Sequence, residues 1–227
     1  MSIKKKILIF VSLIIIVTIY GAMKSKSKPE TQENAVTEWF NGWTRELIEA
    51  RQAYHDKLSA VPIKEIKSEN EYFDVNSMKE LKTSLEGLLA IEMWKINKGL
   101  EINKKWYDKI DPMLNSSIDI DKVDYLKKYF EIGIEETKEF KQITSDYFND
   151  QLAFVNFLLE KDCSLTASDE KRYNELTSKI ETSSTIYNNT VADTYNNRMK
   201  RVREFNEKFK NENVDILLDI VPDGERN

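Results

Sequence analysis

The chain has 227 residues and a formal net charge of −5 at pH 7, and 32% of its residues are charged. Six glycines and four prolines are too few for a turn-rich β protein. The single cysteine excludes an internal disulfide. Six lysines and no acids precede residue 29, so residues 29–227 hold 28 basic and 39 acidic side chains, a net charge of −11. Such an acidic body repels phosphate, which argues against a nucleic-acid partner.

An uncharged, apolar run covers residues 7–23, with three lysines before it and three after it. As a helix it would span about 25 Å, close to the roughly 30 Å of a bilayer core. It is either an uncleaved anchor or a signal peptide. A cut after Ala22 places Tyr20 where signal peptidase needs a small residue, which favours the anchor. We therefore predict that residues 1–28 are a membrane anchor with one transmembrane helix at 7–23, the alternative being secretion after cleavage.

The lysines leave the orientation undecided, because both flanks carry the same number. The N-terminal tail is short and also carries the amino group of the chain, and such a tail usually stays in the cytoplasm. We therefore expect the rest of the chain to be extracytoplasmic.

The first bundle helix is predicted at residues 31–60, where apolar side chains recur at alternating steps of three and four. They are Val36, Trp39 or Phe40, Trp43, Leu47, Ala50, Tyr54, Leu58 and Val61. Pro62 ends this helix because it lacks an amide donor.

A second helix is predicted at residues 77–111, after a connector at 62–76 and ahead of Pro112. Ser77 and Glu80 have the spacing of a capping box at its start. Gly87 and Gly99 lie inside it, where they either weaken the helix locally or allow another helix to approach closely.

The third helix is predicted at residues 122–161, after a loop at 112–120. Its core stripe is predicted to be Tyr125, Tyr129, Ile132, Phe140, Ile143, Tyr147, Phe154 and Leu158. After a turn at 162–167, Thr166 and Asp169 form a second predicted capping box. The fourth helix is predicted at 168–211, with Tyr173, Leu176, Ile180, Tyr187, Val191, Tyr195, Val202, Phe205 and Phe209 on its core side.

Four amphipathic segments with short connections bury their apolar stripes best against one another. The predicted fold class is therefore all-α: an N-terminal transmembrane helix followed by an elongated antiparallel four-helix bundle with up-down-up-down topology. The predicted divisions are the anchor at 1–28, the bundle at 29–212 and a C-terminal tail at 213–227. The apolar residues of the tail, such as Leu217 and Leu218, either dock on the bundle or stay loose.

Residues 182–197 of the fourth helix are unusually rich in Ser, Thr and Asn, which are mediocre helix formers. One interpretation is size matching, in which small residues face the large aromatic residues of the third helix. The other is a polar-lined ligand pocket. The pocket would consist of Ser183, Ser184, Tyr187, Thr190 and Thr194, facing Phe140 and Tyr147.

A basic patch near the end of the fourth helix contains Arg198, Lys200, Arg201 and Arg203. Cations are favourable at a helix C-terminus, which accounts for the patch without a function. Alternatively, Arg198, Arg201 and Arg203 receive an acidic partner or the acidic surface of a second copy.

Catalytic chemistry is not indicated. His55 is the only histidine, so paired Glu-x-x-His metal motifs are impossible. Asp119, Asp121 and Asp124 resemble the start of a calcium loop, but the glycine and glutamate of that motif are missing. Helix capping by these acids is the simpler interpretation. We predict no catalytic, cofactor-binding or metal site.

The sequence thus predicts a membrane-anchored, extracytoplasmic helical bundle with a structural or protein-interaction role and no enzymatic activity. Its expected partners are the membrane, through residues 7–23, and another protein or a second copy of the chain. The alternative function is a bundle that senses or binds a ligand through the Ser/Thr/Asn section of the fourth helix.

Overall fold

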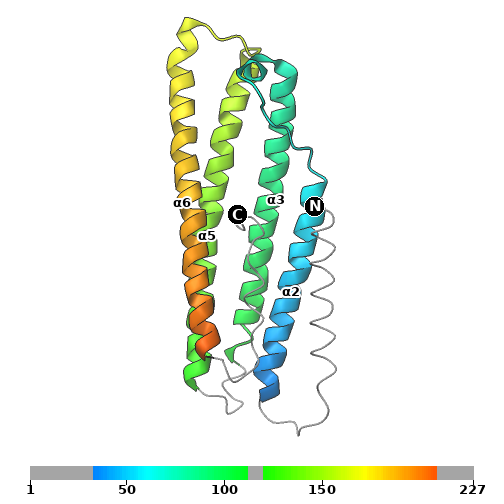
Figure 1. Cartoon of the computed structure of the whole chain (residues 1–227), viewed down its shortest axis with the longest axis vertical. Coiled ribbons are helices and arrows are strands. Elements are labelled where there is room, and N and C mark those ends of the chain that lie inside the picture. The colour runs from blue at the N-terminus through cyan, green and yellow to red at the C-terminus, as the bar shows by residue number, and fades with distance from the viewer. Residues whose placement is uncertain (1–32, 112–119, 209–227) are drawn as a thin grey trace, which may run out of the picture. The chain divides into compact units, whose positions relative to one another are not determined.

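A computed structural model describes residues 33–111 and 120–208. Four helices account for most of these residues: α2 (Glu33–Ser59), α3 (Val75–Tyr107), α5 (Ile120–Glu160) and α6 (Glu170–Lys208) (Figure 1). Short 3₁₀ turns, η1 (Glu69–Phe73) and η2 (Ala167–Asp169), precede α3 and α6, and neither of the two ranges contains a strand. The all-α prediction is confirmed for this part of the chain.

By compactness the chain divides into two units, Met1–Asn34 and Ala35–Asn227, and the packing described below lies within the second. The predicted anchor at 1–28 and the predicted tail at 213–227 lie outside the described residues. Within the described ranges, no helix is both long and apolar enough to cross a bilayer.

Consecutive helices of the second unit run in opposite directions, as contacts between their ends show. Trp39, near the start of α2, meets Trp106 near the end of α3, with ring centroids 5.7 Å apart. Tyr107 at the end of α3 donates a 2.6 Å hydrogen bond to Glu131 near the start of α5. Tyr129 of α5 lies 5.3 Å from Phe205 near the end of α6.

All four helices contribute to one apolar core, which we call the tryptophan core. It consists of Trp39, Phe40, Trp43, Ile102, Trp106, Ile110, Val123, Leu126, Phe130, Val202 and Phe205. Trp39 donates its indole N–H to the carbonyl oxygen of Trp106 at 3.0 Å. The ring of Trp106 lies against Gly42, because a Cβ atom there would be only 2.2 Å from that ring. A glycine on α2 therefore sets how closely α2 and α3 approach.

The second core contains no buried residue of α2, which has already ended at Ser59. Its buried members are Met78, Leu85, Phe148, Phe154, Val155, Phe157, Leu158, Cys163 and Leu176. Ile66 packs against its edge from the chain between α2 and α3, and Val75, the first residue of α3, also packs against it. We call residues 60–74 the connector; it covers the core where α2 is missing.

Two predictions about helices were wrong in detail. The N-cap of α3 is Asp74, whose carboxylate accepts from the Ser77 amide at 2.7 Å, so Ser77 lies inside the helix and is not its cap. On α5, Ile132 is 38% exposed, whereas Phe130, Phe148 and Val155 are buried. The single predicted stripe was too narrow because α5 packs against both α3 and α6 and therefore buries a broad face.

The turn between α5 and α6 bears out the second predicted capping box. The Asp169 carboxylate accepts from the Thr166 amide at 3.0 Å and pairs with Lys161 at 2.8 Å. The bond to Lys161, with those from Thr166, lowers the pKa of Asp169 to about 2. Asp162 and Cys163 both have left-handed backbones, with φ of 46° and 54°. The Cys163 amide thereby reaches the Leu158 carbonyl at 2.8 Å and closes the end of α5.

Candidate functional site

Polar side chains from different helices meet between the two cores. Tyr54 of α2 donates a 2.5 Å hydrogen bond to Glu92 of α3, which also pairs with Lys95 at 3.1 Å. Burial, followed by the bond to Glu92, raises the pKa of the Tyr54 hydroxyl. Burial and the negative charge of Glu92 also raise the pKa of Tyr187 on α6, to about 12. Both tyrosines are therefore neutral hydrogen-bonding groups at physiological pH.

The residues of the predicted ligand pocket are partly brought together. Tyr187 stacks on Tyr147 at 4.5 Å and on Phe140 at 5.8 Å, so these three rings join α5 to α6. Ser183 is buried, and its hydroxyl donates to the Ile180 carbonyl of its own helix at 3.3 Å. The other three residues, Ser184, Thr190 and Thr194, are half-buried.

Two open hollows among the described residues lie elsewhere. One is an open groove between α2 and α3 with Ala50, Ala53, Trp94 and Ile102 in its lining, and the other lies along the outer face of α5. A ligand-binding role for the Tyr187 region therefore stays a prediction, and the stacked rings already fill part of the space that a ligand would need.

The predicted basic patch is divided between two faces of α6. Arg201 donates both terminal nitrogens to the two carboxylate oxygens of Glu136 on α5, at 2.5 Å each. Arg198, three residues earlier on the same face, is half-buried, and burial lowers its pKa. Arg203 and Lys200 are exposed. The helical period separates Arg203 from the other two arginines, so the three do not form one docking surface.

The other residues that the sequence analysis considered for catalysis or metal binding have no special arrangement in the described part of the chain. His55 is exposed beside Tyr54, with ring centroids 5.5 Å apart. Asp121 lies in the first turn of α5, where an acid offsets the helix dipole, and Asp119 lies outside the described residues. In the described part of the chain, no group of three or more His, Cys, Asp or Glu residues is placed to hold a metal ion.

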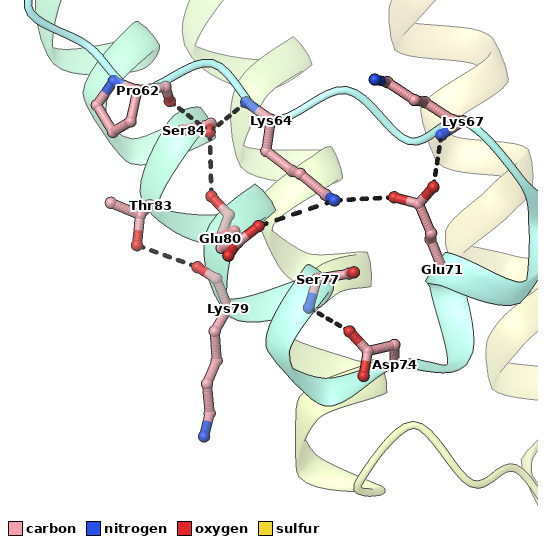
Figure 2. Close-up of polar contacts among 10 residues, drawn as sticks. All are labelled: Pro62, Lys64, Lys67, Glu71, Asp74, Ser77, Lys79, Glu80, Thr83 and Ser84. Carbon is pink, nitrogen blue, oxygen red and sulfur yellow. Dashed lines mark hydrogen bonds and ion pairs between the residues drawn. The ribbon is translucent and has the colours of Figure 1, made fainter.

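The most elaborate polar arrangement is centred on Ser84, which the sequence did not single out (Figure 2). Its hydroxyl accepts from the Lys64 amide at 2.9 Å and lies within donating distance of the Pro62 carbonyl, 2.6 Å, and the Glu80 carbonyl, 3.0 Å. Ser84 is 2% exposed. A buried hydroxyl on α3 thus fixes the first half of the connector.

Ion pairs tie the two halves of the connector to each other. The Lys64 ammonium lies 2.8 Å from Glu71 and 3.7 Å from Glu80, and Glu71 also accepts from the Lys67 amide at 3.2 Å (Figure 2). Glu71 raises the pKa of Lys64, and Lys64 in turn lowers the pKa of Glu71. A further close approach follows from Gly87, where a Cβ atom would be 2.9 Å from Val61. The segment that approaches Gly87 is therefore the connector and not another helix, and Gly99 has open space around it, so neither glycine shows the expected close approach of a helix.

This fixed connector holds apolar side chains in solvent. Seven large hydrophobic residues among those described are exposed, and three of them belong to the connector: Ile63 at 56%, Tyr72 at 37% and Phe73 at 55%. Ile63 precedes Lys64 and Tyr72 follows Glu71, so the Lys64–Glu71 pair brings the two apolar segments together. We call these three residues the connector surface. The sequence could have indicated this surface, because large apolar residues are unexpected in a loop.

Comparison of the chain with protein-family models, with curated proteins and with solved structures finds no match. The described residues define the class of the protein as an all-helical bundle, and its function is argued from the residues themselves.

Proposed function

We propose that this chain is a membrane-anchored, extracytoplasmic protein whose elongated, up-down-up-down bundle binds another protein through the connector surface and has no catalytic role. The observation that carries the proposal is the exposure of Ile63, Tyr72 and Phe73 on a backbone that Ser84 and the Lys64 ion pairs hold in place. Scattered exposed apolar residues are ordinary on a protein surface, but exposed aromatic residues gathered on an ordered loop are typical of binding sites.

The energetics favour recognition by this surface. Ordering a loop costs roughly 1–2 kcal/mol of backbone entropy per residue. In the folded chain the polar contacts of the connector offset this cost before any partner binds. A partner therefore meets side chains that are already positioned, and binding loses less conformational entropy than it would with a disordered segment.

The anchor half of the proposal is supported by the uncharged run at 7–23 and its flanking lysines. The strongly acidic remainder of the chain favours standing off from an anionic bilayer. Helix α2 has 27 residues and is therefore about 40 Å long, and the connector begins at its C-terminal end.

Membrane attachment is tested in cells with the full chain. Leu13→Arg places a charge in the middle of the apolar run. We expect carbonate to leave the unaltered protein in the membrane fraction and to release the Leu13→Arg variant. Ile3→Arg, outside the run, is the matched control and should stay attached. Release of the unaltered protein by carbonate, or retention of Leu13→Arg, would contradict the anchor.

The connector surface is tested by incorporating a photoreactive amino acid at Ile63, Phe73 or Ile186 and irradiating whole cells. Ile186 is a matched control, because it is 47% exposed but lies on α6. We expect one discrete cross-linked product from positions 63 and 73 and none from 186. A product of twice the chain's mass would mean that the partner is a second copy. Equal products from all three positions, or none, would contradict the proposal.

A further inference from the structure

Between its two cores the bundle has a section in which few side chains are buried. We call it the middle section, and it comprises residues 45–59 of α2, 86–101 of α3, 131–147 of α5 and 177–201 of α6. Within these ranges only Ile96, Thr144 and Ser183 are buried, and Ile96 belongs to neither core. The Thr144 and Ser183 hydroxyls donate to carbonyls of their own helices, at 2.8 and 3.3 Å, so these bonds join no two helices.

The two cores are far apart along the helices. On α5, Phe148 of the second core follows Phe130 of the tryptophan core by 18 residues, which is about 27 Å along the helix axis. On α6, Val202 follows Leu176 by 26 residues, which is about 39 Å. Burial of apolar surface is the dominant favourable term in folding, so each core is stabilised within itself. The middle section, which fully buries only one apolar side chain, gains less from this term.

Polar and aromatic contacts join the helices of the middle section instead. Tyr54 of α2 donates to Glu92 of α3 at 2.5 Å, and Arg201 of α6 donates both terminal nitrogens to Glu136 of α5 at 2.5 Å. The side chains of Arg201 and Glu136 are 16% and 26% exposed, so water reaches this ion pair. The ring stack at Tyr187 also joins α5 to α6. Contacts that water can replace contribute less to stability than dry apolar packing does.

The helices of the middle section also have weak helix-forming residues. Gly99 of α3 and Gly133 of α5 both lie in it, and a Cβ atom added at either would meet nothing within 4 Å. Glycine inside a helix loses more backbone entropy on folding than alanine does, and no close packing offsets that loss here. On α6, residues 182–197 are rich in Ser, Thr and Asn, which form helices poorly. Low helix propensity and sparse packing therefore coincide, which is the combination that favours local opening.

We propose that the middle section is a conformational joint, which opens as one unit while the tryptophan core and the second core stay folded. Opening breaks the Tyr54–Glu92 and Arg201–Glu136 contacts and lets the two ends of the bundle move relative to each other. The connector surface is held from Ser84, which lies on α3 outside the middle section and next to Leu85 of the second core. The joint therefore requires neither the membrane anchor nor a partner at the connector surface.

Native-state hydrogen exchange of the full-length protein in mild detergent tests the joint, at several urea concentrations below the unfolding transition. We expect amides in peptides 131–143 and 184–200 to exchange about tenfold faster than those in peptides 123–130 and 148–158. The two middle peptides should share one dependence on urea, smaller than that of the core peptides, because they open together and expose less surface than global unfolding does. Equal protection along the whole of α5, or exchange of the middle peptides that does not respond to urea, would overturn the proposal.

A matched pair of arginine variants tests whether the contacts of the middle section hold the joint closed. Arg201→Gln leaves Glu136 without its ion pair, and we expect it to speed exchange in peptides 131–143 and 184–200 about tenfold without changing peptide 148–158. Arg172→Gln removes an exposed pair with Glu175 at the start of the same helix, 3.3 Å long, and should leave the middle peptides unchanged. Equal acceleration of all peptides by Arg201→Gln would mean that the bundle opens only as a whole, and would overturn the proposal. The unaltered protein decides the question even if Arg201→Gln does not fold.

Discussion

Replacement by alanine should change the stability of the protein in opposite directions at two glycines, Gly42 of α2 and Gly99 of α3. At Gly42 a new Cβ atom would lie 2.2 Å from one carbon of the Trp106 ring and 2.8 Å from the next. That ring has little room to move, because Trp39 lies against it at 5.7 Å and the Lys109 ammonium lies 4.0 Å from its centroid. At Gly99 no atom lies within 4 Å of the new Cβ.

The magnitudes follow from these surroundings. Replacing a helical glycine by alanine stabilises by about 0.5–1 kcal/mol through the unfolded chain, and this term applies to both positions. Overpacking a core costs about 1–3 kcal/mol, and this term applies only to Gly42. We expect Gly99→Ala to raise the melting temperature by about 2 °C and Gly42→Ala to lower it by several degrees.

Thermal unfolding of the full-length protein in mild detergent, followed by circular dichroism, measures both changes. The tryptophan fluorescence of Gly42→Ala should also change, because the substitution displaces the Trp106 ring. If Gly42→Ala were as stable as Gly99→Ala, the close packing of α2 against α3 at this position would be wrong.

Three further predictions concern the connector and the turn between α5 and α6. Ser84→Ala should destabilise by about 1–2 kcal/mol and accelerate tryptic cleavage after Lys64 and Lys67, because the Lys64 amide and the Pro62 carbonyl lose their partner. Thr83→Ala, which removes only an exposed hydroxyl bonded to the Lys79 carbonyl of its own helix, is the control, and equal cleavage of the two variants would contradict the role of Ser84. The pKa of Asp169 is about 2 when folded, below its ordinary value of 3.8, so its contribution to stability is present above about pH 4 and is lost as the pH falls towards 2. Asp169→Asn should remove this part of the acid sensitivity in a pH series of unfolding curves, and unchanged curves would show that Lys161 does not hold the carboxylate. Cys163 is 3% exposed and burial raises the pKa of its thiol, so maleimide should label it slowly in the native protein and rapidly in urea; fast native labelling would contradict its burial.

The helices could be predicted from the sequence because their signals are local. Trp39, Trp43, Leu176 and Phe205 recur at helical spacing, and the structure packs each of them against or into a core. The Thr166–Asp169 capping box was equally readable, since both partners lie within one turn. The start of α3 was misplaced because Ser77 and Asp74 both fit an N-cap, and only the backbone decides between them: the extended φ and ψ of Asp74 make it the cap.

The candidate site could not be predicted in the same way, because its contacts are long-range. Ser84 lies 20 residues from the amide that it accepts from and 22 residues from the carbonyl of Pro62. No periodicity within either segment links them. The sequence instead drew attention to composition, the Ser/Thr/Asn section of α6 and its basic patch, where the structure shows ring stacking at Tyr187 and a paired Arg201.

The shorter length of α2 explains why the connector carries exposed apolar side chains. Because α2 ends at Ser59 while α3, α5 and α6 continue, the second core is left with one side that a loop must cover. Ile66 of the loop packs against that side, and Tyr72 reaches the core at Phe154, with ring centroids 6.3 Å apart. Ile63 and Phe73 are not needed for it and remain in solvent. The loop that takes the place of a longer α2 therefore leaves exposed the two apolar side chains through which the proposed partner would bind.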